Sequence, residues 1–115
     1  MKKIYHLKTC DTCKRILKQV NLDGFEIQEI KNTPVNKEQL DEMYAFTKSY
    51  EALFNKRARL YKEQGLKDKN LSEDDYKDLI LSEYTFLKRP VAIVDNEIFV
   101  GNSKKTIEEL VAKTA

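Results

Sequence analysis

Two cysteines, Cys10 and Cys13, are the side chains of this sequence whose type and spacing best fit covalent chemistry. They lie three positions apart in the run Thr9-Cys10-Asp11-Thr12-Cys13. A thiol reacts as its thiolate, and in a reducing cytosol a pair at this spacing is more often a redox or metal site than a structural bridge. We therefore interpret Cys10 as the attacking nucleophile and Cys13 as the resolving thiol of a thiol–disulfide exchange, with Thr9 and Thr12 shaping the loop.

The cysteine pair has three other interpretations. Zinc needs about four ligands, and beyond the two cysteines and His6 the chain offers only scattered carboxylates, so we expect no metal. A cysteine protease needs a histidine beside its nucleophile, and His6, the only histidine, lies on the strand that leads into the site, so we reject that class. Two unreactive cysteines that share this spacing by chance are the remaining alternative.

The pattern around the pair predicts a strand before it and a helix after it. Lys2 to Leu7 is rich in β-branched, aromatic and apolar residues, and Phe25 to Ile30 is similar, so both are expected strands. Between them, apolar residues at 13, 16, 17 and 20 form one helical face, which Asn21 to Gly24 ends. The result is a βαβ unit with parallel strands. Cys10 then begins the helix, where unpaired amides and about half a positive charge favour its thiolate, with Lys14 and Arg15 adding charge.

The rest of the chain is predicted to be a helical insert followed by two strands and a helix. Asn36 with Gln39 and Ser72 with Asp75 match capping boxes, and residues 50–64 are expected to form one or two short helices that Gly65 ends. Strands are expected at 91–94 and 97–100, with a turn at Asp95-Asn96 and a helix after residues 101–103. The apolar positions expected to face inward are Leu40, Met43, Tyr44, Leu79, Ile80, Ile107, Leu110 and Val111.

This order of elements predicts the fold class. A βαβ unit, a helical insert at about 36–86 and a ββα unit together indicate one α/β domain over residues 1–115. The arrangement is thioredoxin-like (glutaredoxin-like), with a four-stranded mixed sheet flanked by helices.

Arg89-Pro90 directly precedes the expected central strand. Proline has no amide to donate to a strand ladder, so it suits this position. The thioredoxin-like fold has a cis-proline at this place, so we predict a cis Arg89-Pro90 bond, with an ordinary trans bond as the alternative. A cis bond would hold Arg89 near Cys10, where its guanidinium could bind an anion or stabilise a thiolate. The basic run from Asn55 to Arg59 with Lys62 is either a solvated face or added positive charge at the mouth of the site.

The composition excludes several classes of protein. The 115 residues include 21 Lys and Arg against 19 Asp and Glu, a net charge of +2, and 41% of them are hydrophobic. That balance is unlike a disordered segment or a nucleic-acid binder held by a strong positive field. No apolar run approaches the roughly 20 residues of a spanning helix, and Lys8 to Asp11 interrupts any signal-peptide core. We therefore expect a bacterial, cytoplasmic protein with no membrane partner and no direct nucleic-acid contact.

Three segments taken together resemble the arsenate reductase (ArsC)/Spx/YffB family over essentially the whole chain. They are Cys10-Asp11-Thr12-Cys13-Lys14, Phe54-Asn55-Lys56-Arg57 with Tyr61, and Arg89-Pro90-Val91 through Val100-Gly101. The resemblance implies a thioredoxin-like fold with a reactive cysteine at Cys10. The family's arsenate reductases have one cysteine in this loop and three arginines around the oxyanion. One arginine matches Arg89, a second falls on Asn55 with Arg57 close by, and the third falls near Gly101 and is absent. These residues, Arg89, Arg57 and Asn55, are our candidates for thiolate or anion binding.

The second cysteine makes the loop similar to the YffB-like and Spx-like branches of that family. The resemblance then implies a thiol–disulfide oxidoreductase with no tightly bound cofactor, whose reductant is glutathione or a thioredoxin- or glutaredoxin-type protein. Arsenate reduction with glutathione and glutaredoxin is one alternative. A redox-sensing transcriptional regulator that binds the RNA polymerase α-subunit is the other.

Overall fold

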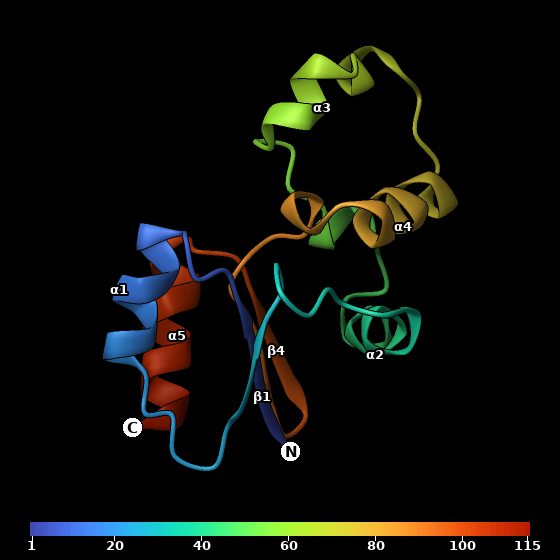
Figure 1. Ribbon diagram of the computed structural model, residues 1–115. Coiled ribbons are helices and arrows are strands. Elements are labelled where there is room, and N and C mark those ends of the chain that lie inside the picture. Colours follow the sequence, from blue (N-terminus) through green and yellow to red (C-terminus); the bar gives the residue numbers. More distant parts are fainter. The chain divides into compact units, whose positions relative to one another are not determined.

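A computed structural model describes the whole chain, Met1–Ala115 (Figure 1). Its strands and α-helices, in chain order, are β1 Lys2–His6, α1 Asp11–Gln19, β2 Glu26–Glu29, α2 Lys37–Thr47, α3 Arg59–Glu63, α4 Glu73–Ser82, β3 Val91–Val94, β4 Glu97–Val100 and α5 Lys104–Thr114. Three short 3-10 helices complete the set: η1 Glu51–Leu53, η2 Leu66–Asp68 and η3 Tyr84–Phe86. No helix is both long and apolar enough to span a bilayer.

The chain divides into two compact units. The first consists of residues 1–34 and 89–115, and the second of residues 35–88. The predicted helical insert at about 36–86 lies within the second unit. That all 115 residues act as a single domain stays a prediction.

The first unit is built on a four-stranded sheet in the order β2-β1-β3-β4. Strand β1 runs parallel to β2 and antiparallel to β3, and β3 runs antiparallel to β4, which confirms the predicted βαβ unit and mixed sheet. In this register Tyr5, near the end of β1, lies opposite Val91, the first residue of β3. The segment that follows β1 and the segment that precedes β3 therefore lie side by side at the same end of these two central strands.

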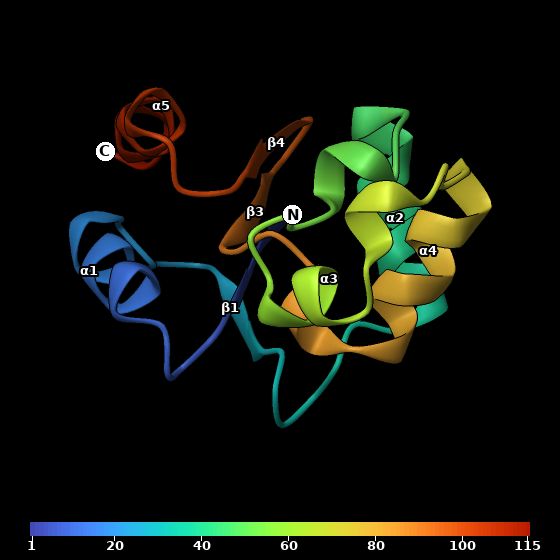
Figure 2. The same ribbon diagram turned by 90° about the horizontal axis from the view of Figure 1, so that it is seen from above.

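Helices α1 and α5 lie on the same face of this sheet, as two views of the ribbon agree (Figure 1, Figure 2). The apolar positions of α1 face the sheet because they recur at helical spacing, and Ile16 and Val20 are buried there with Leu17 packed beside them. From α5, Leu110 is buried and Ile107 and Val111 pack against the same core, as predicted. The remaining core members are Ile4, Ala92, Val94, Phe99, Leu22 and Phe25.

Local backbone predictions in the first unit are confirmed. The Arg89-Pro90 bond is cis. Asp95 takes a positive φ of 54° in the turn between β3 and β4, as expected for a two-residue hairpin. Ser103 caps α5 by accepting a hydrogen bond from the amide of Thr106 at 3.2 Å. Helix α1 begins at Asp11, two residues before the first apolar position of its buried stripe.

The second unit contains short helices that are fixed mainly by caps and aromatic contacts. Both predicted capping boxes are present, at Asn36 on α2 and at Ser72 on α4. Segment 50–64 forms the two predicted short helices, η1 and α3, and Gly65 follows them with φ 64°. They are separated because Phe54 is extended and pairs with Leu87 as an isolated β-bridge. Ile80 is buried as predicted, whereas Leu79 is only partly buried and lines a surface hollow.

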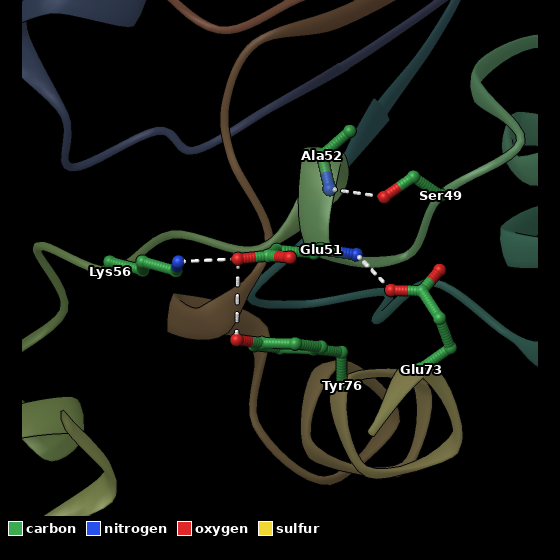
Figure 3. Close-up of polar contacts among 6 residues, drawn as sticks. All are labelled: Ser49, Glu51, Ala52, Lys56, Glu73 and Tyr76. Carbon is green, nitrogen blue, oxygen red and sulfur yellow. Dashed lines mark hydrogen bonds and ion pairs between the residues drawn. The ribbon is translucent and has the colours of Figure 1, made fainter. Parts of the chain in front are cut away.

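A polar network joins η1 to α4 within this unit (Figure 3). The carboxylate of Glu73 accepts hydrogen bonds from the amides of Tyr50 and Glu51, at 2.7 and 3.2 Å. The carboxylate of Glu51 is paired with Lys56 and accepts from the Tyr76 hydroxyl. The unpaired amides at the start of η1 are thereby satisfied by a side chain from α4.

Candidate functional site

The loop that carries the cysteine pair is a tight turn at the end of β1. The amide of Cys10 donates to the carbonyl of Leu7 at 3.1 Å, so Lys8 and Thr9 occupy the centre of a β-turn. Cys10 then has an extended backbone (φ −91°, ψ 112°) and is the N-cap residue of α1. The sequence prediction that the first cysteine begins the helix is therefore confirmed.

Cys10 is a free, partly exposed thiol whose surroundings favour ionisation. Burial alone would raise the pKa of Cys10, but hydrogen bonds from the backbone N–H and thiol of Cys13, and from the side chain of Arg89 together with its charge, outweigh it. The pKa of Cys10 therefore lies below its ordinary value of 9.0. The sulfur makes no capping hydrogen bond of standard geometry, yet the amide of Cys13, in the third helical position, still stabilises its anion.

Cys13 has the opposite character. It is a free thiol with no exposed surface. Burial raises the pKa of Cys13 to about 11; the amide of Leu7 lowers it, and the negative charge of Cys10 raises it further. The two sulfurs thus differ in acidity, and the thiol of Cys13 is a hydrogen-bond partner that favours the anion of Cys10. This asymmetry fits the predicted roles of nucleophile and resolving thiol.

The cation beside Cys10 is Arg89. Arg89 is a half-buried residue and directly precedes Pro90, which is buried. Sequence position suggested that Lys14 and Arg15 would add to the field, but both are exposed on α1, and the cation that lowers the pKa of Cys10 most is Arg89. Arg89 lies near Cys10 because the antiparallel pairing of β1 and β3 brings the segment after β1 next to the segment before β3.

The other predicted anion-binding residues, Asn55 and Arg57, lie in the second unit. The amide side chain of Asn55 donates to the carbonyl of Thr85 at 3.2 Å and accepts from the backbone N–H of Arg57 at 3.0 Å. Arg57 is exposed. Within the basic run, Lys56 is paired with Glu51 and Arg59 with Glu63. Asn55 thus holds local backbone in place, and anion binding by Asn55 or Arg57 stays a prediction.

The site-shaping residues occupy ordinary positions. Thr9 is exposed in the turn, and Thr12 is half-buried in the first turn of α1. No three His, Cys, Asp or Glu side chains are grouped as metal ligands in the 115 residues. The expectation that the protein works without a metal stays a prediction.

Sequence reasoning missed Glu29, the last residue of β2. Its carboxylate accepts hydrogen bonds from three backbone amides: Lys8 at 2.8 Å, Lys31 at 2.9 Å and Asn32 at 2.7 Å. A signal was available, because a parallel βαβ unit brings the ends of its two strands together, and Glu29 lies opposite His6. An acidic residue at the end of the second strand is therefore expected beside the turn after the first.

The fold and the site together define a thioredoxin-like protein with a Cys-x-x-Cys pair at the start of its first helix. A family model described as "ArsC family" matches residues 5–110. The uncharacterized protein YusI of Bacillus subtilis (strain 168) is 31% identical over 110 residues, which cover 91% of this chain and 93% of that protein.

Two solved structures share the fold. A YffB protein superposes with a TM-score of 0.81 at 21% identity, covering all of both chains. An arsenate reductase from Vibrio cholerae superposes with a TM-score of 0.74 at 23% identity, covering 99% of this chain and 97% of that one. The chain belongs to the ArsC family and has its arsenate reductase-like, thioredoxin-like fold.

Proposed function

We propose that this protein is a thiol–disulfide oxidoreductase that uses Cys10 and Cys13 as its redox pair. The observation that carries the proposal is the contrast between the two sulfurs. Cys10 is accessible, begins a helix and has a lowered pKa beside Arg89, while Cys13 is buried and has a raised pKa. A two-step exchange requires this difference, because one sulfur must react first with the substrate and the other must stay protonated until it attacks the mixed disulfide.

In the first step the Cys10 thiolate attacks one sulfur of a substrate disulfide. A bond forms between Cys10 and that sulfur, the substrate S–S bond breaks, and the other sulfur leaves as a thiolate that takes a proton from solvent. Arg89 stabilises the attacking anion until the bond forms.

In the second step Cys13 loses its proton to solvent and attacks the sulfur of Cys10. The mixed disulfide breaks, the substrate leaves as a second thiolate, and Cys10 and Cys13 are oxidised by two electrons. Once Cys10 is in a mixed disulfide it no longer carries the negative charge that helps to raise the pKa of Cys13. Reaction at the first sulfur thus makes the second easier to ionise.

A thiol reductant returns the pair to the dithiol. We propose glutathione as a co-substrate, or a thioredoxin- or glutaredoxin-type protein, acting in the cytosol where such donors keep thiols reduced. No tightly bound cofactor is needed for this chemistry.

The proposal is tested by trapping. Incubated with oxidised glutathione, Cys13→Ser should accumulate one glutathione per chain, attached to Cys10, as measured by mass spectrometry of the intact chain and of its peptides. Cys10→Ser, the matched control, should accumulate none. Equal labelling of the two variants would contradict the proposed roles.

Two assays separate this function from its alternatives. Arsenate turnover with glutathione and glutaredoxin would show that the protein is an arsenate reductase. Of the three arginines that the family's arsenate reductases place around the oxyanion, only the one at Arg89 is matched in this chain. Capture of the RNA polymerase α-subunit by only one redox form, without disulfide reductase activity, would show a regulator. We expect disulfide reduction and neither of these results.

A further inference from the structure

The geometry points to Glu29 as a positioning residue for Cys10: its carboxylate fixes the turn before the cysteine pair and so keeps both sulfurs in their places. This inference rests on the proposed reactivity of Cys10. It concerns a residue outside the cysteine loop and on a different strand.

The first step of the argument is the turn itself. In the β-turn Leu7–Cys10 the only backbone hydrogen bond runs from the Cys10 amide to the Leu7 carbonyl. The amide of Lys8, at the second position of the turn, is not used by the turn. The Lys8 amide donates a hydrogen bond to Oε2 of Glu29 at 2.8 Å, so the turn is connected to the end of β2.

The second step is that Glu29 is itself fixed. While one carboxylate oxygen accepts from Lys8, the other accepts from the amides of Lys31 and Asn32. Partial burial would raise the pKa of Glu29, but these three amides and His6 lower it below its ordinary value. The Glu29 side chain is therefore an anion that accepts hydrogen bonds from three backbone amides, and hydrogen bonds to an ionised group are the stronger kind. It joins the turn after β1 to the loop after β2.

The third step connects the turn to the sulfurs. The carbonyl of Leu7 holds the Cys10 amide, and the amide of Leu7 acts on the thiol of Cys13. A turn that shifts would therefore move Cys10 away from the Cys13 amide and from Arg89, the groups that stabilise its anion. Glu29 acts on Cys10 through the backbone, without touching the reacting atoms.

A positioning role and a purely electrostatic role of Glu29 predict opposite changes of the Cys10 pKa when Glu29 is replaced, which makes the inference testable. If Glu29 acted on Cys10 only as a nearby negative charge, its removal would make the Cys10 thiolate easier to form. If Glu29 acts by holding the turn, its removal makes that thiolate harder to form.

The experiment compares Glu29→Gln, Glu29→Asp and Glu26→Gln with the unmodified chain. Gln removes the charge and one of the two acceptor oxygens, whereas Asp keeps the charge but is one methylene too short. Glu26→Gln is the matched control, because it removes a carboxylate from the same strand that is paired with Lys3 and accepts no amide of the turn. The rate of Cys10 alkylation by iodoacetamide is measured against pH, and the modified residue is confirmed by mass spectrometry.

We expect Glu29→Gln and Glu29→Asp each to raise the pKa of Cys10 and slow its alkylation at pH 7 about threefold, and Glu26→Gln to change neither. Faster hydrogen exchange at the Lys8 amide in both Glu29 variants is the second expected result. An unchanged or lowered Cys10 pKa in the two Glu29 variants would overturn the inference, as would an equal shift in Glu26→Gln. An ordinary pKa for Cys10 in the unmodified chain would instead refute the proposed function.

Discussion

The two compact units of this chain hold their structures together in different ways. In residues 1–34 with 89–115, the sheet pairs segments far apart in sequence, and the surroundings of Cys10 combine groups from the turn after β1, from α1 and from the residue before Pro90 and β3. In residues 35–88, capping boxes act within a few residues, and ring stacks and polar contacts join helices of one continuous segment. Both cysteines belong to the first unit. The difference teaches that the thiol site depends on the pairing of segments far apart in the chain, whereas the contacts of the second unit lie within one continuous segment.

Phe54→Ala should have the largest effect, on stability alone. The ring is buried and packs against Tyr61, Tyr76 and Phe86, all in the second unit. We expect the free energy of unfolding in urea to fall by about 3–5 kcal/mol while the pKa of Cys10 in the folded chain stays the same. Phe99→Ala removes an equal ring from the core of the first unit and is the control. A larger change of the Cys10 pKa in Phe54→Ala than in Phe99→Ala would break the comparison.

The buried thiol of Cys13 should make the reduced protein less stable in alkali. Cys13 ionises near its ordinary pKa of 9.0 when unfolded, but near 11 when folded. Between these pH values unfolding releases a proton, so the stability that Cys13 contributes is complete below pH 9 and is lost as the pH rises to about 11. The loss should amount to about 3 kcal/mol.

Urea unfolding of the reduced chain at pH 8 and pH 10.5 measures this effect. In Cys13→Ala the decrease between the two pH values should be smaller, since the lysines and tyrosines titrate equally in both proteins. Cys10 acts in the opposite direction, because the stability that its lowered pKa contributes still rises from pH 8 towards its ordinary pKa of 9.0. The same slope in both proteins would show that Cys13 ionises normally.

Arg89→Ala should weaken the chemistry of the first unit with a smaller cost in stability. Loss of the guanidinium removes a hydrogen bond and a positive charge from the Cys10 thiolate. We expect the pKa of Cys10 to rise and alkylation at pH 7 to slow about tenfold, as a charge-assisted hydrogen bond would give. Arg15→Ala is the matched control: it is an exposed arginine close to Cys10 in sequence and should leave the rate unchanged. Equal effects would mean that overall charge, rather than sheet topology, sets the pKa.

Asn36→Ala should have the smallest effect, confined to the second unit. Its side chain accepts the Gln39 amide at 2.8 Å, and the Gln39 side chain accepts the Asn36 amide in return. Removing the cap should lower the free energy of unfolding by about 1 kcal/mol and leave Cys10 alkylation as it was. Slower alkylation in this variant would link the start of α2 to the thiol site.

The same division explains what the sequence could predict. Signals carried by neighbouring residues were correct: both capping boxes, the turn at Asp95 and the helix end at Gly65. The cis Arg89-Pro90 bond was also correct, but only because the order of elements had already indicated the fold. These features are decided within a few residues, so a single sequence is enough to find them.

The features that the sequence could not predict depend on which residues lie close in space although they are far apart along the chain. Lys14 and Arg15 are close to Cys10 along the chain, yet the cation that acts on Cys10 is Arg89, because strand pairing rather than sequence separation decides proximity. Glu29 was missed for the same reason. Leu79 matched a buried helical stripe but is only partly buried, since periodicity shows which side of a helix faces inward and not how deeply it is covered.

The meeting of β1 and β3 has a consequence for the protein as it is made. Cys10 leaves the ribosome first, and Arg89 follows roughly 80 residues later, which takes several seconds at common rates of translation. During that interval the nascent cysteine lacks the guanidinium that lowers its pKa in the folded chain. The full lowering of the Cys10 pKa is therefore reached only after β3 has been made and has paired with β1.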